Sequence, residues 1–122
     1  MSWDLSNDRP IYSQIVEKIQ LRIISGYYAS GSKLPSVREL AAEAGVNPNT
    51  MQKAFMELER SGLLTTMRTS GRIVTEDEAM IREVKEKIAK QEIEQFFKKM
   101  SEIGFMHEQT MNLAKDLYKE EK

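Results

Sequence analysis

A short row of polar side chains recurs at helical spacing in the middle of the chain. Asn49, Gln52, Lys53 and Met56 fall at three- and four-residue spacings within residues 47–60, and residues at these spacings share one face of an α-helix. Asn and Gln side chains can bind adenine through two hydrogen bonds, and the Lys ammonium can reach a guanine or a phosphate. The row is therefore a candidate base-reading surface for double-stranded DNA. The alternative is a solvated helix face without a ligand.

Two further candidates lie just before this segment. Arg38 occupies the first turn of another predicted helix, where a cation is unfavourable because the helix dipole makes that end positive. We therefore expect its side chain to reach outward to a phosphate or a guanine edge; an ion pair with Glu39 or Glu43 is the alternative. Ser36 has a structural role as the helix cap, and a phosphate contact would be a second role.

Helices with regular apolar stripes must hold these residues in place. Pro10 suits the first turn of a helix, because its missing N–H has no partner there. The apolar stripe of this first helix consists of residues four apart: Ile11, Ile15, Ile19 and Ile23. Ser25-Gly26 ends the helix, and residues 27–34 are predicted to form a loop.

Two short helices follow, and both begin with capping signals. Ser36 and Glu39 form a capping box, in which each side chain binds the other residue's backbone N–H. Asn47 is a good N-cap and Pro48 a good first residue for the next helix, and free backbone N–H groups beside Thr50 would suit a phosphate. The core-facing stripe of this helix is Met51, Ala54, Phe55 and Leu58. Two helices joined by a short glycine-containing turn predict a helix-turn-helix.

A β-hairpin is predicted after the third helix. Residues 63–67 and 72–75 form two short strands joined by a turn, which would be the wing of a winged helix-turn-helix. Arginines at the ends of such a turn can lie along a minor groove or across the DNA backbone; a solvated hairpin tip is the alternative. The candidate DNA contacts of the wing are Arg68, Thr69, Ser70, Gly71 and Arg72.

Beyond Thr75 the pattern changes to two amphipathic helices, a long one that ends near Gly104 and a shorter one. Two helices joined by a tight bend cannot bury both apolar stripes alone, so we expect a second copy of the chain to cover them. The predicted domains are a DNA-binding domain at residues 1–75 and a helical dimerisation domain at residues 76–122. The predicted dimer contacts are Ile81, Val84, Ile88, Ile93, Phe96, Phe97, Met100, Ile103, Met106, Leu113 and Leu117. The fold class is mainly α with a small β-hairpin (α+β): a winged helix-turn-helix followed by a two-helix dimerisation arm.

Composition and charge define the class of protein without deciding its ligand. The chain has 122 residues, 40% of them hydrophobic and 30% charged, no cysteine, and a net charge of −1. Such a composition is typical of a soluble protein, and no apolar run approaches the roughly 20 residues of a membrane span. Residues 1–75 carry nine basic and seven acidic side chains, a net of +2, whereas residues 76–122 carry nine and twelve, a net of −3. We expect a cytoplasmic protein with a mildly basic N-terminal part.

No set of residues indicates catalysis, a metal site or a cofactor. His107 is the only histidine, so neither a histidine metal cluster nor a histidine-based catalytic pair is available. We therefore expect a protein that is not an enzyme. A small-molecule effector near Trp3, Tyr27 or Phe105 is one hypothesis, and core packing of these aromatic side chains is the alternative.

The combination of motifs resembles the GntR family of bacterial transcription regulators. The similarity covers residues 10–75, and the segments that carry it are residues 10–15, 31–41 (Gly-Ser-Lys-Leu-Pro-Ser-Val-Arg-Glu-Leu-Ala), 45–50, 58–63 and 70–74. The resemblance implies DNA-contacting positions at Ser36, Arg38, Asn47, Asn49, Thr50, Gln52 and the wing around residues 68–71.

The 47 residues after Thr75 resemble the tail of the YtrA-like subfamily, in which a short helical tail is a dimerisation element. Members of that subfamily often control operons for ABC transporters. The resemblance implies a homodimeric repressor in the bacterial cytoplasm, nucleoid-associated when bound. It would place residues 49–60 in the major groove of an inverted-repeat operator, with the wings on adjacent minor grooves. The alternative from another class is a winged-helix protein-interaction module without specific DNA binding.

Overall fold

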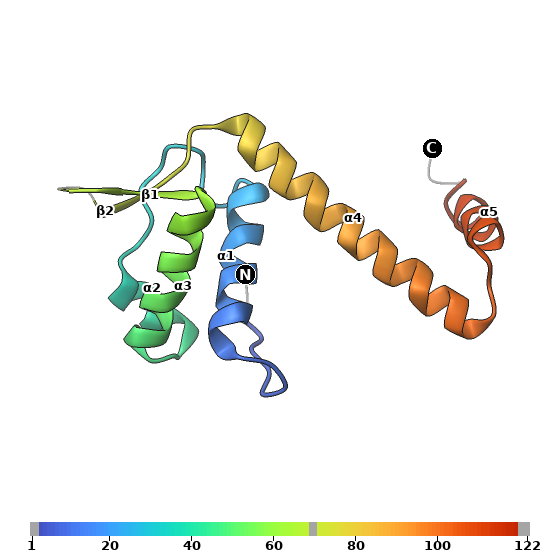
Figure 1. Cartoon of the computed structure of the whole chain (residues 1–122), viewed down its shortest axis with the longest axis horizontal. Coiled ribbons are helices and arrows are strands. Elements are labelled where there is room, and N and C mark those ends of the chain that lie inside the picture. The colour runs from blue at the N-terminus through green and yellow to red at the C-terminus, as the bar shows by residue number, and fades with distance from the viewer. Residues whose placement is uncertain (1–2, 69–70, 120–122) are drawn as a thin grey trace. The chain divides into compact units, whose positions relative to one another are not determined.

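The computed structural model describes residues 3–68 and 71–119 and shows helices with a β-hairpin between them (Figure 1). In chain order the elements are α1 (Ile11–Ile24), α2 (Val37–Ala44), α3 (Pro48–Ser61), β1 (Leu64–Met67), β2 (Gly71–Val74), α4 (Glu78–Ile103) and α5 (His107–Tyr118). The predicted fold class is confirmed, and the strands differ from the prediction by one residue at their ends. Contacts divide the chain into two compact units, Met1–Val84 and Lys85–Lys122.

The N-terminal unit is built on three helices around an apolar core. α3 packs against α1, α2 and β1, and the hairpin follows the C-terminal end of α3 (Figure 1). The predicted stripes of α1 and α3 are buried except for Ile11, which is half-buried. The buried members are Ile15, Ile19, Ile23, Met51, Ala54, Phe55 and Leu58. Burial of one such aliphatic or aromatic side chain contributes about 1.5–3 kcal/mol. These stripes therefore fix the position of α3 relative to α1.

The predicted caps of α2 and α3 are both present. The Ser36 hydroxyl accepts from the Glu39 N–H at 3.1 Å, and the Glu39 carboxylate accepts from the Ser36 N–H at 3.0 Å. Gly45 ends α2 with a left-handed φ of 72°, a conformation that costs glycine little because it lacks a Cβ. Asn47 caps α3, with Pro48 at its first position. The tight turn between the two helices thus follows from local sequence.

The predicted loop at residues 27–34 pairs with the hairpin. β1 and β2 are antiparallel, with Leu64 opposite Val74. Val74 also donates its N–H to the Ser32 carbonyl at 2.9 Å, and Leu34 donates to the Arg72 carbonyl at the same distance. Residues 27–34 form no helix or strand, so the loop prediction is confirmed, but these hydrogen bonds and a single bridge between Lys33 and Ile73 hold residues 31–34 beside β2. Pairing between distant segments leaves no periodic signal in a short polar stretch, so the sequence did not show this contact.

α4 begins in the N-terminal unit and continues in the C-terminal one. Met80, Ile81 and Val84 pack against the core of the N-terminal unit. The contact boundary therefore lies inside α4, whereas the predicted functional division falls at residue 75. That division stays a prediction.

The C-terminal unit consists of the rest of α4, a tight bend and α5. Gly104 ends α4 with a φ of 111°, and the Phe105 N–H donates to the Met100 carbonyl at 2.9 Å. The rings of Phe97 and His107 lie 4.8 Å apart, so the two helices contact each other across the bend.

Most of the predicted dimer contacts leave apolar surface uncovered within their unit. Ile88, Phe97 and Met100 are half-buried. The exposed members are Ile93, Phe96, Ile103, Met106, Leu113 and Leu117. Ile81 and Val84 are the exception, because the core of the N-terminal unit already partly buries them. This packing explains their apolar character within the unit, and their contact with a second chain stays a prediction.

In the part of the chain that the structure describes, no helix has the length and apolar character needed to cross a membrane. Nor do three acidic, histidine or cysteine side chains gather there in a way that could hold a metal ion.

Candidate nucleic-acid interface

A groove of about 430 Å³ lies between the start of α2, the side of α3 and the hairpin. It brings together predicted site residues from three separate segments. α2 and its cap supply Ser36 and Arg38, α3 supplies Gln52, and β2 supplies Gly71 and Arg72. The packing of α3 on α2 and β1 therefore produces one continuous surface from positions that lie far apart in the sequence.

Arg38 is exposed in this groove and forms no hydrogen bond or ion pair with any other described residue. The two carboxylates that were alternative partners are engaged elsewhere. Glu39 accepts from the Ser36 N–H, and Glu43 accepts from the Trp3 indole and pairs with Arg22. The ion-pair alternative is therefore wrong, and the guanidinium is available for an external anion or base.

Ser36 caps α2 and also contacts the Glu39 carboxylate. Its oxygen accepts from the Glu39 N–H. The backbone hydrogen bond from Ser36 and its side-chain hydrogen bond both lower the pKa of the Glu39 carboxyl, and the nearby Lys33 ammonium lowers it further. Glu39 is thus ionised at neutral pH, and the capping box is intact under the conditions of DNA binding.

Lys33 is a cationic residue of the groove that the sequence reasoning missed. It lies opposite Ile73 in the segment that pairs with β2, and it lines the groove together with Arg38. The only available signal was a lysine directly before the Leu34-Pro35 pair. Its position became meaningful only when residues 31–34 proved to lie beside the wing.

Arg72 braces the hairpin against α3. Its Nε lies 3.3 Å from Glu59 Oε1, and its side chain is 23% exposed. Its guanidinium carbon lies 5.2 Å from the centre of the Phe55 ring. Glu59 also accepts from the hydroxyl of Thr66 on β1. These contacts give Arg72 a structural role that explains its presence without DNA.

The other wing candidates differ in what can be said of them. Arg68 and Gly71 are exposed, and Gly71 has a φ of 79°, so a residue with a Cβ would be strained there. Thr69 and Ser70 lie outside the described residues. Contact of the wing with DNA stays a prediction.

The start of α3 offers side chains, not backbone donors. Pro48 has no N–H, the Asn49 N–H donates to Asn47 Oδ1 at 2.7 Å, and the Thr50 N–H donates to the Asn47 carbonyl at 3.0 Å. The predicted phosphate contact through free backbone N–H groups is therefore wrong. The exposed Asn49 and the half-buried Thr50 can bind DNA only through their side chains.

Gln52 and Lys53 lie on opposite flanks of the exposed side of α3, because consecutive helical residues point about 100° apart. Gln52 lines the groove beside Arg38. Lys53 lies towards α1, with its Nζ 4.1 Å from the centre of the Tyr12 ring. Met56 is 53% exposed. The predicted row on α3 is therefore accessible, but its two flanks have different neighbours.

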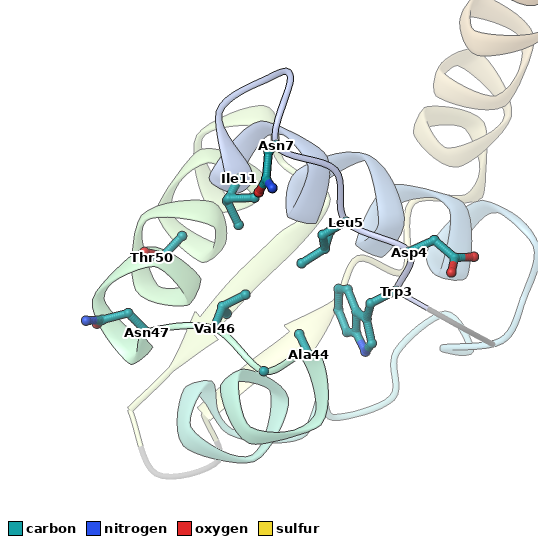
Figure 2. Close-up of a pocket in the computed structure, with 10 residues that line it drawn as sticks. Trp3, Asp4, Leu5, Asn7, Ile11, Ala44, Val46, Asn47 and Thr50 are labelled. Carbon is teal, nitrogen blue, oxygen red and sulfur yellow. The ribbon is translucent and has the colours of Figure 1, made fainter.

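A second hollow, of about 480 Å³, lies between residues 3–7 and the turn that precedes α3. Figure 2 shows Trp3 and Leu5 facing Ala44 and Val46 across it, while the carboxylate of Asp4 points away. Polar and apolar residues both line it, and no feature of it identifies a ligand.

Trp3 has a structural role beside this hollow. Its indole N–H donates to Glu43 Oε2 at 2.7 Å, and its ring lies 4.5 Å from the buried guanidinium carbon of Arg22. Arg22 also donates to the hydroxyl of Tyr28 at 2.6 Å. Core packing therefore explains Trp3, whereas Tyr27 is exposed and forms the outer side of the same cluster, with its ring centre 5.0 Å from the Arg22 carbon.

Known proteins are similar to this chain over most of its length. The family model of bacterial regulatory proteins of the gntR family matches residues 11–74. The helix-turn-helix-type transcriptional regulator YhcF of Bacillus subtilis is 37% identical over 111 residues, which are 91% of this chain and 92% of YhcF. The helix-turn-helix-type transcriptional repressor YtrA of the same organism is 43% identical over 74 residues, which are 61% of this chain and 57% of YtrA.

Solved structures share the fold, and one of them is a complex with an operator. A GntR family transcriptional regulator from Listeria monocytogenes has a TM-score of 0.84 and 41% identity, covering 92% of this chain and 98% of that one. AraR(DBD) in complex with operator ORX1 has a TM-score of 0.53 and 33% identity, covering 59% of this chain and 88% of that one. The family match spans the helices and hairpin that build the groove, and YhcF is related over nearly its whole length. The chain belongs to the GntR family of bacterial regulatory proteins and is a DNA-binding transcriptional regulator, not an enzyme.

Proposed function

We propose that this regulator is a homodimeric repressor that binds an inverted-repeat operator. In this proposal α3 enters the major groove and the hairpin lies against the adjacent minor groove. The observation that carries it is the groove that unites Arg38, Gln52 and the hairpin on one side of the N-terminal unit. Lys33 and Arg38 line this groove as cations beside the capping carboxylate Glu39, and Arg72 there is paired with Glu59, so the charge of the groove suits a polyanion.

The side chains divide into two kinds of contact. Arg38 and Gln52 have the donors that read guanine and adenine edges in a major groove. Ser36, Asn49 and Thr50 are short polar side chains at helix starts, which suit the phosphates that set register and orientation. Arg68 would extend the contact into a minor groove.

The proposed dimer rests on the apolar surface of the C-terminal unit. Phe96, Ile103, Met106 and Leu117 are each about half exposed or more, and apolar patches of this kind mark interaction sites. A second copy is the proposed partner, because a two-fold dimer matches a two-fold operator. The similarity to the repressor YtrA supports repression through exclusion of RNA polymerase. From the YtrA-like tail we propose that the regulated genes form a transporter operon. We also propose that the protein acts in the cytoplasm.

The test is to sequence the genomic DNA that the purified chain retains. We expect one enriched motif with two half-sites in inverted orientation, their centres about 10–10.5 base pairs apart or a multiple of that spacing. Binding to the recovered fragment should weaken steeply with salt, because phosphate contacts release counterions. A single unpaired half-site would contradict the dimer. No enrichment, with binding that is insensitive to salt, would favour a protein-interaction module.

A further inference from the structure

Tyr12 holds Lys53 on the flank of α3 that faces α1. The Lys53 ammonium lies 4.1 Å from the centre of the Tyr12 ring, the geometry of a cation–π interaction. Tyr12 is half-buried at the second position of α1, whereas Lys53 is exposed on α3. At an exposed site such a contact favours the held conformation by about two- to fivefold. A long flexible side chain is thereby directed to one place.

That place is a hollow of about 380 Å³ lined by Ile11, Tyr12, Asn49, Thr50 and Lys53. The Lys53 ammonium, the Thr50 hydroxyl and the Asn49 amide can all donate hydrogen bonds. No carboxylate belongs to the lining. Lys53 is the charged residue among those that line the hollow, so the lining has a positive charge. Converging donors around a cation suit an anionic oxygen, and the anion that a DNA-bound α3 meets at its flanks is a backbone phosphate.

The position of Lys53 also argues against base reading. Gln52 points to the opposite flank and lines the groove with Arg38. Lys53 is tied to α1 instead, which directs its ammonium away from the row that faces the base edges. The two neighbouring residues of α3 therefore have different tasks.

We propose that Lys53, Thr50 and Asn49 form a binding site for a DNA-backbone phosphate, with Tyr12 as the positioning residue that holds Lys53 in it. The site rests on the proposed docking of α3 in the major groove. It assigns to Lys53 a contact that carries affinity but no sequence information. Tyr12, which belongs to α1, becomes part of the DNA-binding surface through its ring.

The test compares the variants Lys53→Met, Tyr12→Leu and Tyr12→Phe in the full chain. Affinities are measured across a salt series for two probes, the genomic fragment that the chain retains and a duplex of random sequence. Met matches Lys in length and helix propensity. We expect Lys53→Met to weaken binding to both probes by the same factor. The slope of log affinity against log salt should fall by about 0.9 for each lost phosphate contact, which is about 1.8 for a dimer.

The Tyr12 variants separate positioning from structure. Tyr12→Phe keeps the ring and should bind like the unaltered chain. Tyr12→Leu should weaken binding by about two- to fivefold for each subunit that contacts the DNA, and this effect should vanish when Lys53→Met is already present. Thermal melting shows whether Tyr12→Leu folds. If it does not, the upfield NMR shift of the Lys53 ε-methylene in the unaltered chain and in Tyr12→Phe reports the ring contact directly.

Several results would overturn the assignment. A change in the ratio of the two affinities with an unchanged salt slope would make Lys53 a base reader. Equal effects of Tyr12→Leu with and without Lys53→Met, or an absent ring shift, would remove Tyr12 from the site. A slope change near 0.9 in place of 1.8 would contradict the dimeric operator but support the phosphate site. Two half-sites in the retained DNA, with no change of the salt slope in Lys53→Met, would support the dimeric operator and contradict the phosphate site.

Discussion

At the scale of single residues, the availability of Arg38 follows from what its neighbours bind. Glu39 is engaged in the cap of α2, and Glu43 pairs with Arg22 and Trp3. Neither carboxylate neutralises Arg38, so a cation is left exposed in the groove at the positive end of α2. That unfavourable placement is compensated when a polyanion binds.

Substitution of Arg38 should therefore affect DNA binding and not folding. We expect Arg38→Ala to weaken operator binding by about 1–3 kcal/mol, and to relax specificity at one base pair if the guanidinium reads a guanine. Gel-shift titration on the retained genomic fragment and on single-base variants of it measures both effects. Arg82→Ala removes another exposed arginine, on α4, and should leave the affinity unchanged. Equal affinities of the two variants would take Arg38 out of the interface.

Glu43 shows the opposite case, a charged residue whose task is structural. It binds Trp3 and the buried Arg22, and so ties residues 3–7 to α2. Burial alone would raise the pKa of Glu43, but the hydrogen bonds from Trp3 and Arg22 prevail and lower it below its ordinary 4.5. Folding is therefore stabilised by the ionised carboxylate.

The stability of the chain should depend on pH through this residue. Because the folded-state pKa of Glu43 is lowered, its contribution is complete above about pH 4.5 and is lost as the pH falls through the folded-state pKa. We expect Glu43→Gln to cost about 1 kcal/mol at neutral pH, since solvent screens a half-exposed carboxylate, and the two stabilities to converge in acid. Urea unfolding at several pH values tests this, with Glu83→Gln on the exposed face of α4 as control. A difference that does not depend on pH would contradict it.

At the scale of elements, the cap of α2 lies in the groove itself. Ser36 closes the capping box and also lines the groove. At the other side of the groove, Glu59 on α3 binds Arg72 of β2 and Thr66 of β1. The groove is therefore held at both sides by side chains whose partners lie within the unit.

The two tasks of Ser36 can be separated by substitution. Ser36→Ala should lower the free energy of unfolding by about 0.5–2 kcal/mol through loss of the cap. Asp and Asn cap as well as Ser, so Ser36→Asp and Ser36→Asn should melt near the unaltered chain. Only the carboxylate of Ser36→Asp would repel a phosphate, and we expect a selective loss of DNA affinity in that variant. Equal affinities of the Asp and Asn variants would leave Ser36 with the cap alone.

At the scale of the whole molecule, the N-terminal unit has a complete core and the C-terminal unit does not. The stripes of α1 and α3 are buried, whereas among the described residues of α5 only Thr110 is buried. Ile93, Phe96, Leu113 and Leu117 are exposed. The missing partner surface is the physical reason to expect dimerisation through the C-terminal unit.

A carboxylate in this surface should separate the subunits. We expect Phe96→Glu to halve the mass measured by light scattering. A carboxylate without an ion-pair or hydrogen-bond partner is costly to bury in an apolar interface. The same variant should lose affinity for a two-half-site operator. Gln95→Glu adds the same group at the neighbouring exposed position and should remain dimeric. A dimer that persists in Phe96→Glu would place the interface elsewhere.

The helices, the caps and the family match could be predicted from the sequence, because each depends on residues a few positions apart. The stripe spacing gave α1 and α3, Ser36 with Glu39 gave the start of α2, and Asn47-Pro48 gave the start of α3. The wing was located within one residue at its ends. The candidate residues Arg38 and Gln52 were identified, but the sequence did not show that they share one groove.

The tertiary structure alone decided how distant segments meet. The pairing of residues 31–34 with β2 brought Lys33 into the groove, and the contact with Arg22 removed Glu43 from the possible partners of Arg38. The approach of α1 to α3 directed Lys53 to Tyr12. Local periodicity and capping act within one or two helical turns, so they fix the elements. Which charges stay free for DNA depends on contacts between elements, and only the packed core sets those.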